Sequence, residues 1–159
     1  MKLLALTLTL LFSITTWAKN NVNIHVALTP AGSFNAVTDK VRGKIVKTDT
    51  GFHSKRIEIN IQNLKTGIDL RDEHLWEHLN SKTHSKATLT ELKATNGNAT
   101  AMLEVNGVKV PVSINYVDSG NVVDANFKVK ASDFKLPPKS YLGVGVSDEV
   151  SINVKMGYK

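Results

Sequence analysis

Apolar and polar residues alternate along long stretches of this chain, and no other feature restricts its fold as strongly. Residues 21–28 alternate in this way, and so do residues 56–62, where Ile57 and Ile59 lie between polar neighbours. Successive side chains of a β-strand point to opposite faces, so each segment predicts a strand with one buried face. The same pattern predicts six further strands, about eight in all, over residues 41–47, 86–93, 99–106, 108–116, 121–130 and 149–158.

Turn residues separate several of these segments. Asn96-Gly97 and Asn106-Gly107 each stand between two alternating segments, and Asp118-Ser119-Gly120 precedes a third. Asparagine and glycine adopt the positive φ angles that tight hairpins require. We therefore expect the strands between residues 86 and 130 to pair in sequence as an antiparallel meander.

One segment shows helical spacing instead. Between residues 69 and 80, Leu70, Leu75 and Leu79 recur on one side while charged residues lie elsewhere. The first turn is acidic, which complements the helix dipole, and Asp69 is expected to cap the N-terminus. A short helix at about residues 69–80 is predicted between two strands.

Eight antiparallel strands with one apolar face have two common arrangements, a two-sheet sandwich or a closed barrel. Alternation alone does not choose between them. The interior of a closed eight-stranded barrel is wide enough either to be filled by side chains or to hold one small ligand.

The N-terminal residues have the order of a secretory signal peptide. Lys2 is followed by an apolar run over residues 3–14 and by Thr16-Trp17-Ala18, which ends on a small residue. The apolar run is shorter than the roughly 20 residues of a membrane-spanning helix. We expect residues 1–18 to be removed and residues 19–159 to form one exported, periplasmic domain. The chain has no cysteine, so packing and backbone pairing have to stabilise that domain.

The chain is basic, with 20 Lys and Arg against 14 Asp and Glu. Such a charge permits transient contact with anionic lipid head groups at a membrane surface. The basic residues are scattered along the sequence and aromatic residues make up only 6% of it. That pattern does not favour binding to nucleic acid.

One local motif suggests chemistry. His74, Glu77 and His78 fit the H-x-x-E-H pattern, in which two histidines bind zinc and a glutamate acts as general base. Glu149 is a candidate third ligand, and His84 is a further candidate for weak metal binding. A zinc-dependent hydrolase is therefore an alternative function. Serine and cysteine nucleophile motifs are absent from the sequence.

Four motifs, in order, give the chain a resemblance to the YceI-like family of exported polyisoprenoid-binding proteins. The first is residues 66–75, TGIDLRDEHL, which follow the isoleucine strand. The others are residues 41–45, VRGKI, residues 106–109, NGVK, and residues 147–152, SDEVSI. The resemblance implies a lipocalin-like, extended antiparallel eight-stranded β-barrel. It also implies an apolar tunnel for an isoprenoid or a similar lipid such as a quinone, with no catalytic machinery and no cofactor.

The resemblance places the ligand against inward-facing apolar residues of the strands and of the short helix. Long strand faces of β-branched residues would make such an interior dry, and burial of lipid CH₂ groups would drive binding. A structural or partner-binding barrel with a filled core is the remaining alternative. The candidate ligand-binding residues are Phe34, Ile45, Ile59, Trp76, Leu79, Leu103, Phe127 and Val129.

Overall fold

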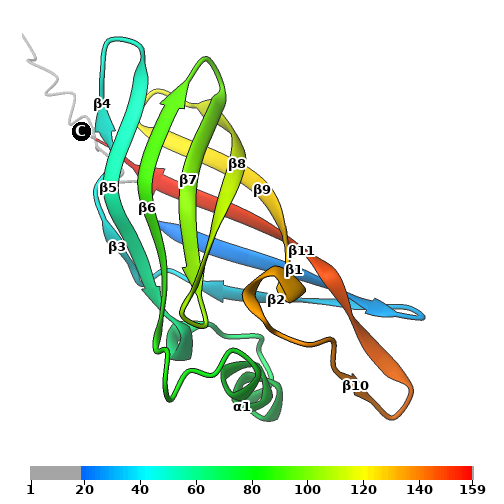
Figure 1. The fold of residues 1–159 in the computed structure, drawn as a ribbon. Coiled ribbons are helices and arrows are strands. Elements are labelled where there is room, and N and C mark those ends of the chain that lie inside the picture. The colour runs from blue at the N-terminus through cyan, green and yellow to red at the C-terminus, as the bar shows by residue number, and fades with distance from the viewer. Residues whose placement is uncertain (1–18, 159) are drawn as a thin grey trace, which may run out of the picture.

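The computed structural model describes residues 19–158, which form a single antiparallel sheet of eleven strands curved into a nearly closed barrel (Figure 1). Neighbouring strands follow the order β2-β1-β11-β9-β8-β7-β6-β5-β3, while β4 pairs with β5 and β10 with β11. The strands are β1 (Asn21–Thr29), β2 (Ser33–Thr38), β3 (Val41–Gly43), β4 (Val46–Lys47), β5 (Gly51–Asn60), β6 (Lys86–Thr95), β7 (Asn98–Val105), β8 (Val108–Asp118), β9 (Val122–Lys130), β10 (Ser140–Tyr141) and β11 (Val144–Gly157).

The segment between residues 33 and 47 closes the sheet. Its first part, β2, pairs with β1, and its later parts, β3 and β4, pair with β5. One broken strand therefore lies between the two ends of the sheet, which selects the barrel over the sandwich. This break and the two-residue strand β10 explain why the structure has eleven strands where the alternation predicted about eight.

The wall of the barrel is weakest where residues 44–47 meet the C-terminal end of β11, a junction called the seam below. A single parallel bridge, between Ile45 and Tyr158, joins the two backbones there. Side chains add to it, because Lys47 Nζ donates to Asp118 Oδ2 at 3.2 Å and to the Tyr158 hydroxyl at 3.3 Å. The seam lacks the continuous backbone ladder that joins the other long strands.

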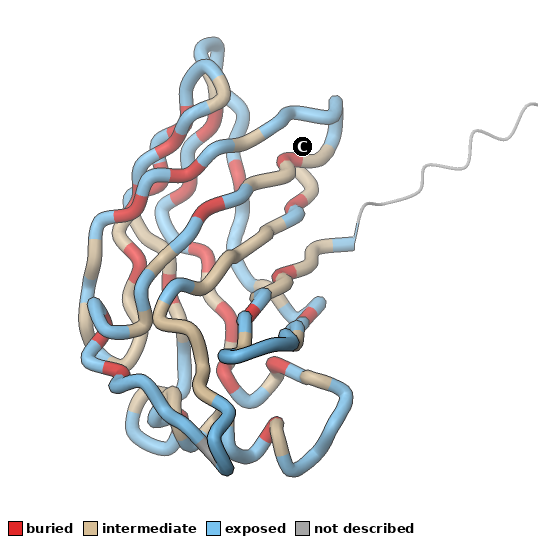
Figure 2. The backbone as a smooth tube through the Cα atoms, turned by 90° about the vertical axis from the view of Figure 1, so that its right-hand side faces the viewer, coloured by how far each residue is buried: buried red, intermediate tan, exposed pale blue. Residues whose placement is uncertain are grey.

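The predicted alternation is confirmed in the burial of the strands. Buried positions recur along the strands between exposed ones in Figure 2, and Val22, Val26, Ile57 and Ile59 are all buried. The predicted hairpins are confirmed as well. Asn96 and Gly97, which connect β6 to β7, both have positive φ, and so do the Asn and Gly between β7 and β8.

The predicted helix is α1 (Asp69–His78), which lies below the barrel in Figure 1. The expectation that Asp69 caps it was wrong: the capping position is Ile68, and no side chain caps the helix there. The predicted strand over residues 56–62 ends earlier than expected, at Asn60. The Asn60 side chain accepts a hydrogen bond from the Gln62 N–H, which starts the 3₁₀ helix η1 (Ile61–Asn63).

A second 3₁₀ helix, η2 (Ala131–Phe134), follows β9 and packs against the barrel. Within residues 19–158, none of the helices is both long and apolar enough to cross a membrane.

Gly43 allows the closing segment to approach β5, and its replacement tests the closure. Its φ is +129°, and a Cβ there would lie 2.4 Å from the carbonyl oxygen of Arg56. We expect Gly43→Ala to lower the free energy of unfolding by about 2–4 kcal/mol, from backbone strain and lost pairing, as measured by urea denaturation. Gly120→Ala is the control, because φ is +92° there but no atom lies within 4 Å of the added Cβ. Equal losses in both variants would contradict the role of the close approach.

Candidate functional site

An apolar cavity of about 190 Å³ lies inside the barrel. Its lining extends from Phe52 and Tyr116 to Ile61 and Leu79. The first two lie at the end of the barrel that carries the turn between β6 and β7, called the hairpin end below. The other two lie at the end that α1 covers, called the helix end. Among the described residues of that lining, Glu58 is the one that is charged. Its carboxylate lies on the outer face of β5, where it pairs with the exposed cations Lys86, at 2.7 Å to Nζ, and Arg56, at 2.8 Å to Nε. The hydrogen bonds from Lys86 and Arg56 hold the pKa of Glu58 below its usual value.

Strand β11 shows that the interior is not filled by side chains. Val150, Ile152 and Val154 alternate toward the cavity and line it, yet each is only partly buried. In a packed core such inward-facing residues of a central strand touch other side chains on all sides. Here they face open space, which argues against the barrel with a filled core.

Aromatic side chains close the hairpin end of the cavity. The Phe52 ring lies edge-to-face against Tyr116 at 5.6 Å and against Tyr158 at 4.8 Å between ring centroids. The Tyr158 hydroxyl donates to Asp118 Oδ1 at 2.5 Å, on the outer side of this cluster. That hydrogen bond, together with those from the Gly120 N–H and from Lys47, lowers the pKa of Asp118. Aromatic packing inside and polar contacts outside therefore fasten the seam at this end.

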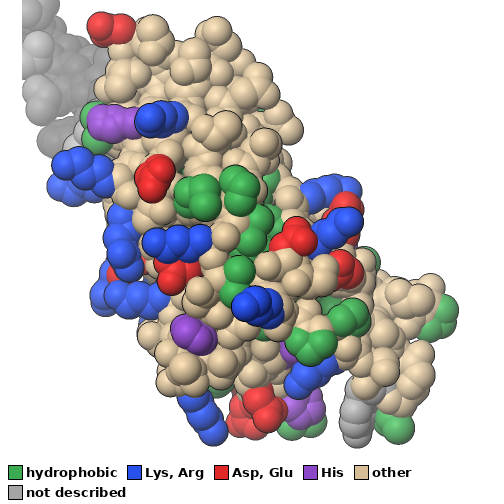
Figure 3. All heavy atoms as spheres, viewed as in Figure 1, with side chains coloured by type: hydrophobic (Ala, Val, Ile, Leu, Met, Phe, Trp, Pro, Cys, Tyr) green, Lys and Arg blue, Asp and Glu red, His purple; other side chains and the backbone are tan. Residues whose placement is uncertain are grey.

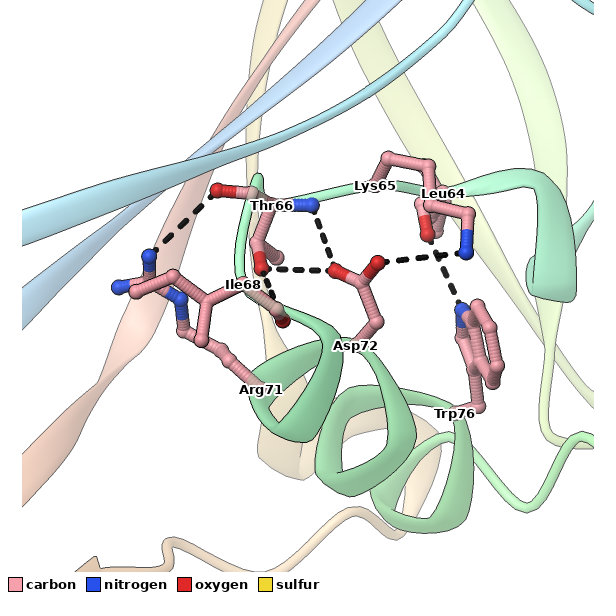
Figure 4. Close-up of polar contacts among 7 residues, drawn as sticks. All are labelled: Leu64, Lys65, Thr66, Ile68, Arg71, Asp72 and Trp76. Atoms are coloured by element: carbon pink, nitrogen blue, oxygen red, sulfur yellow. Dashed lines mark hydrogen bonds and ion pairs between the residues drawn. The ribbon is translucent and has the colours of Figure 1, made fainter.

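The helix end of the cavity is closed by α1 and the loop before it. Leu79 and Leu64 line the cavity, and Leu64 is 1% exposed. Trp76 fixes the helix to this loop, because its indole N–H donates to the Leu64 carbonyl oxygen at 3.0 Å. Figure 4 shows Trp76 beside the polar contacts that hold the start of the helix.

Asp72 is the centre of those polar contacts. Its carboxylate accepts hydrogen bonds from the backbone N–H and the hydroxyl of Thr66, both at 2.7 Å, and forms an ion pair with Lys65 at 3.3 Å (Figure 4). Burial alone would raise the pKa of Asp72, but the Thr66 donors and Lys65 outweigh it and lower the pKa. A buried, ionised carboxylate thus holds the loop against the first turns of the helix.

Six of the eight predicted ligand-binding residues line the cavity. Their contact with a ligand stays a prediction. The six are Ile45, Ile59, Leu79, Leu103, Phe127 and Val129.

Phe34 and Trp76 are not among the residues that line the cavity, and their contact with a ligand also stays a prediction. The Phe34 ring lies under the guanidinium of Arg71, 5.0 Å from its centroid, and Trp76 lies under the ammonium of Lys65 at 4.3 Å. Both rings therefore pack against cations at the end of the barrel that the helix covers. Their aromatic character, visible in the sequence, does not reveal this use.

Three buried residues from irregular segments were missed by the alternation, and all of them line the cavity. They lack strand spacing because they lie in η2 or in the loops that follow η1 and η2. The available signal was a large apolar residue within a polar loop. These residues are Leu64, Phe134 and Leu136.

The two histidines of the zinc motif lie on α1, as expected, but no third ligand joins them. Among residues 19–158, no three His, Asp or Glu side chains form a group that could hold a metal ion. Glu149, the candidate third ligand, instead accepts a hydrogen bond from Lys128 Nζ at 2.7 Å. Burial, with a contribution from Lys139, lowers the pKa of His78. His84 packs against the turn at Gly107, where an added Cβ would lie 2.6 Å from its ring.

Comparison with known families and structures gives a consistent result. A family model, the YceI-like domain, matches residues 13–158. No curated protein matches the chain in sequence.

Several solved structures share the fold. BcnA from Burkholderia cenocepacia is 16% identical with a TM-score of 0.69, over 86% of this chain and 94% of its own. A polyisoprenoid binding domain from Saccharophagus degradans, implicated in plant cell wall breakdown, is 17% identical with a TM-score of 0.63, over 86% and 91%. A mutant CJ YCEI protein is 22% identical with a TM-score of 0.57, over 76% and 82%.

Replacing Asp72 tests how the helix end of the cavity is held. We expect Asp72→Asn to lower the free energy of unfolding near neutral pH by about 1–3 kcal/mol, because it removes a charge that accepts two hydrogen bonds. The pKa of Asp72 is lower in the folded protein than its usual value of 3.8, so its stabilisation is complete above that value. It is lost as the pH falls through the lower, folded value.

The difference between wild type and Asp72→Asn in urea denaturation should therefore shrink in strongly acidic buffer. Asp69→Asn is the control, since this exposed carboxylate on the same turn makes none of these contacts. A difference that persists unchanged in acid would contradict the assignment of a low pKa to Asp72.

Proposed function

The chain belongs to the YceI-like domain family, and we propose that it is a periplasmic, non-catalytic binding protein that holds one long apolar lipid inside its barrel. A polyisoprenoid or a quinone with an isoprenoid tail is the ligand class proposed. The observation that carries the proposal is the apolar cavity, whose lining residues come from both ends of the barrel. The polyisoprenoid binding domain from Saccharophagus degradans, which has the same fold, supports the choice of ligand.

The lining of the cavity supports an apolar occupant. An apolar cavity of about 150 Å³ stays dry and takes up small apolar molecules, and the cavity here is somewhat larger at about 190 Å³. A polar ligand would lose its hydrogen bonds to water without finding partners on walls of Val, Ile, Leu and Phe side chains. A hydrocarbon ligand has no hydrogen bonds to water to lose.

Chain length decides how tightly such a ligand binds. Each CH₂ group removed from water contributes about 0.8 kcal/mol, while the loss of translational and rotational freedom costs about 4–15 kcal/mol. A hydrocarbon of a few carbons would therefore bind weakly. A long unbranched or isoprenoid chain that follows the cavity from Phe52 toward Leu79 would recover this cost.

A binding role without catalysis is supported by the chemistry of the lining. Proton transfer or nucleophilic attack needs a polar side chain that reaches the bound molecule. Among the described residues that line the cavity, Glu58 is the one acidic group, and Lys86 and Arg56 hold its carboxylate.

The periplasmic location rests on the N-terminal sequence. The signal peptide expected over residues 1–18 lies outside the described residues. Its order of Lys2, an apolar run and Thr16-Trp17-Ala18 supports export. A chain without cysteine is suited to that compartment, because it needs no disulfide to fold.

Native mass spectrometry of the protein purified from periplasm under gentle conditions tests the proposal. We expect an added mass of a hydrophobic molecule, identified as a lipid after extraction into organic solvent. Lipid binding would be refuted if the purified protein showed no added mass and also took up no lipid from vesicles that contain isoprenoid quinones.

A variant that fills the cavity makes this test specific. Ala125 lines the cavity, so in Ala125→Phe the new ring should occupy ligand space. We expect bound lipid to fall at least tenfold while the thermal unfolding temperature stays near that of wild type. Ala27→Phe is the matched control, because Ala27 is exposed on β1 and should leave the lipid in place. Equal lipid content in both variants would place the binding site elsewhere.

A further inference from the structure

The outer face of β3, β4, β5 and β6 concentrates positive charge. In Figure 3, Lys and Arg side chains gather on the left side of the molecule, where Figure 1 places these strands. Two acidic residues, Glu58 and Glu91, lie among them. We call this surface the basic face; its cations, all exposed, are Arg42, Lys44, Lys55, Arg56, Lys86 and Lys93.

Most of these cations have no anionic partner among residues 19–158. Glu58 uses both carboxylate oxygens, one for Arg56 and one for Lys86. In the part of the chain that the structure describes, the other four cations of the basic face form no ion pair. Like charges held side by side repel one another, so an external anionic surface would be attracted to this face.

The wall formed by β9 and β11 is different. On β9 and β11, Lys128 pairs with Glu149, and Lys155 pairs with Asp124. These one-to-one pairs leave little net charge there. The formal charge of +6 of the whole chain is therefore unevenly distributed over the barrel, with its excess on the basic face.

An exposed apolar residue lies within the basic face. Val46 is 45% exposed, and in the sheet it stands opposite His53, which in turn stands opposite Lys93. An exposed apolar side chain on a face that carries cations suits a surface with anionic head groups above hydrocarbon. A purely ionic partner, such as a nucleic acid, would gain nothing from Val46.

We propose that the basic face docks the protein onto a membrane surface rich in anionic phospholipids. Cations of β3 to β6 contact the head groups, and Val46 inserts among them. Since β4 forms one side of the seam, docking turns the weakest part of the barrel wall toward the bilayer. The docking surface does not depend on which molecule the cavity holds.

Sedimentation of the purified protein with vesicles tests the docking. We expect binding to vesicles of phosphatidylcholine mixed with phosphatidylglycerol, weakening as salt is added, and little binding to phosphatidylcholine alone. The test variant is Arg42→Gln, Lys44→Gln, Lys55→Gln. Each cation near an anionic bilayer strengthens binding by about fivefold, so the triple variant should bind about 100-fold more weakly.

The control removes the same charge from the other wall. Lys109→Gln, Lys128→Gln, Lys130→Gln alters β8 and β9, on the side of the barrel away from β5, and should bind within about threefold of wild type, because these residues lie far from the head groups. Circular dichroism and thermal unfolding confirm that both variants fold. Val46→Ser, which keeps every charge, should weaken binding severalfold.

Equal loss in the two triple variants would overturn the proposal, since net charge alone would then explain binding. Failure of the wild-type protein to bind anionic vesicles would overturn it as well. If the wild-type protein binds immobilised polyglutamate but no vesicle, the basic face is a site for an acidic protein partner instead, and the proposal is wrong.

Discussion

Closure of the sheet through residues 33–47 is the interaction on which the rest of the structure depends. Each backbone N–H and C=O at an open sheet edge lacks a partner, and the broken strand supplies partners to β1 on one side and β5 on the other. Closure turns the apolar face of every strand inward. The cavity exists because eight or so closed strands leave more interior space than their side chains fill.

The two ends of the barrel are closed by different means, and the difference bears on ligand exchange. The helix end is held by a buried carboxylate, Asp72, with two hydrogen bonds from Thr66 and an ion pair. The seam at the other end is held by one backbone bridge, by the packing of Phe52 against Tyr158 and by exposed contacts of Lys47. Exposed ion pairs contribute less than about 1 kcal/mol, so the aromatic packing contributes most of the side-chain stabilisation of the seam. The basic face adjoins it.

Much of the fold followed from local sequence, and particular residues show why the rest did not. The alternation around Ile57 and Ile59 and the Asn106-Gly107 turn act between near neighbours, so strands and hairpins were predictable. Six of the proposed ligand residues line the cavity because inward spacing on a strand is a local property. Phe34 and Trp76 lie off the cavity lining because they pack against Arg71 and Lys65, contacts that form only in the folded protein. Asp69 appeared to be a cap, whereas Asp72 makes the contacts.

The sequence by itself determined the strand pattern, the hairpins, the short helix and the family, because each is encoded in the spacing of side chains along the chain or in ordered motifs. The tertiary structure decided whether the sheet closed, where it was weakest and how much of the interior stayed empty. These properties depend on contacts between residues such as Ile45 and Tyr158, which are far apart in sequence. The gathering of scattered cations into the basic face is likewise a result of strand pairing, since cations from β3, β5 and β6 become neighbours only in the folded sheet.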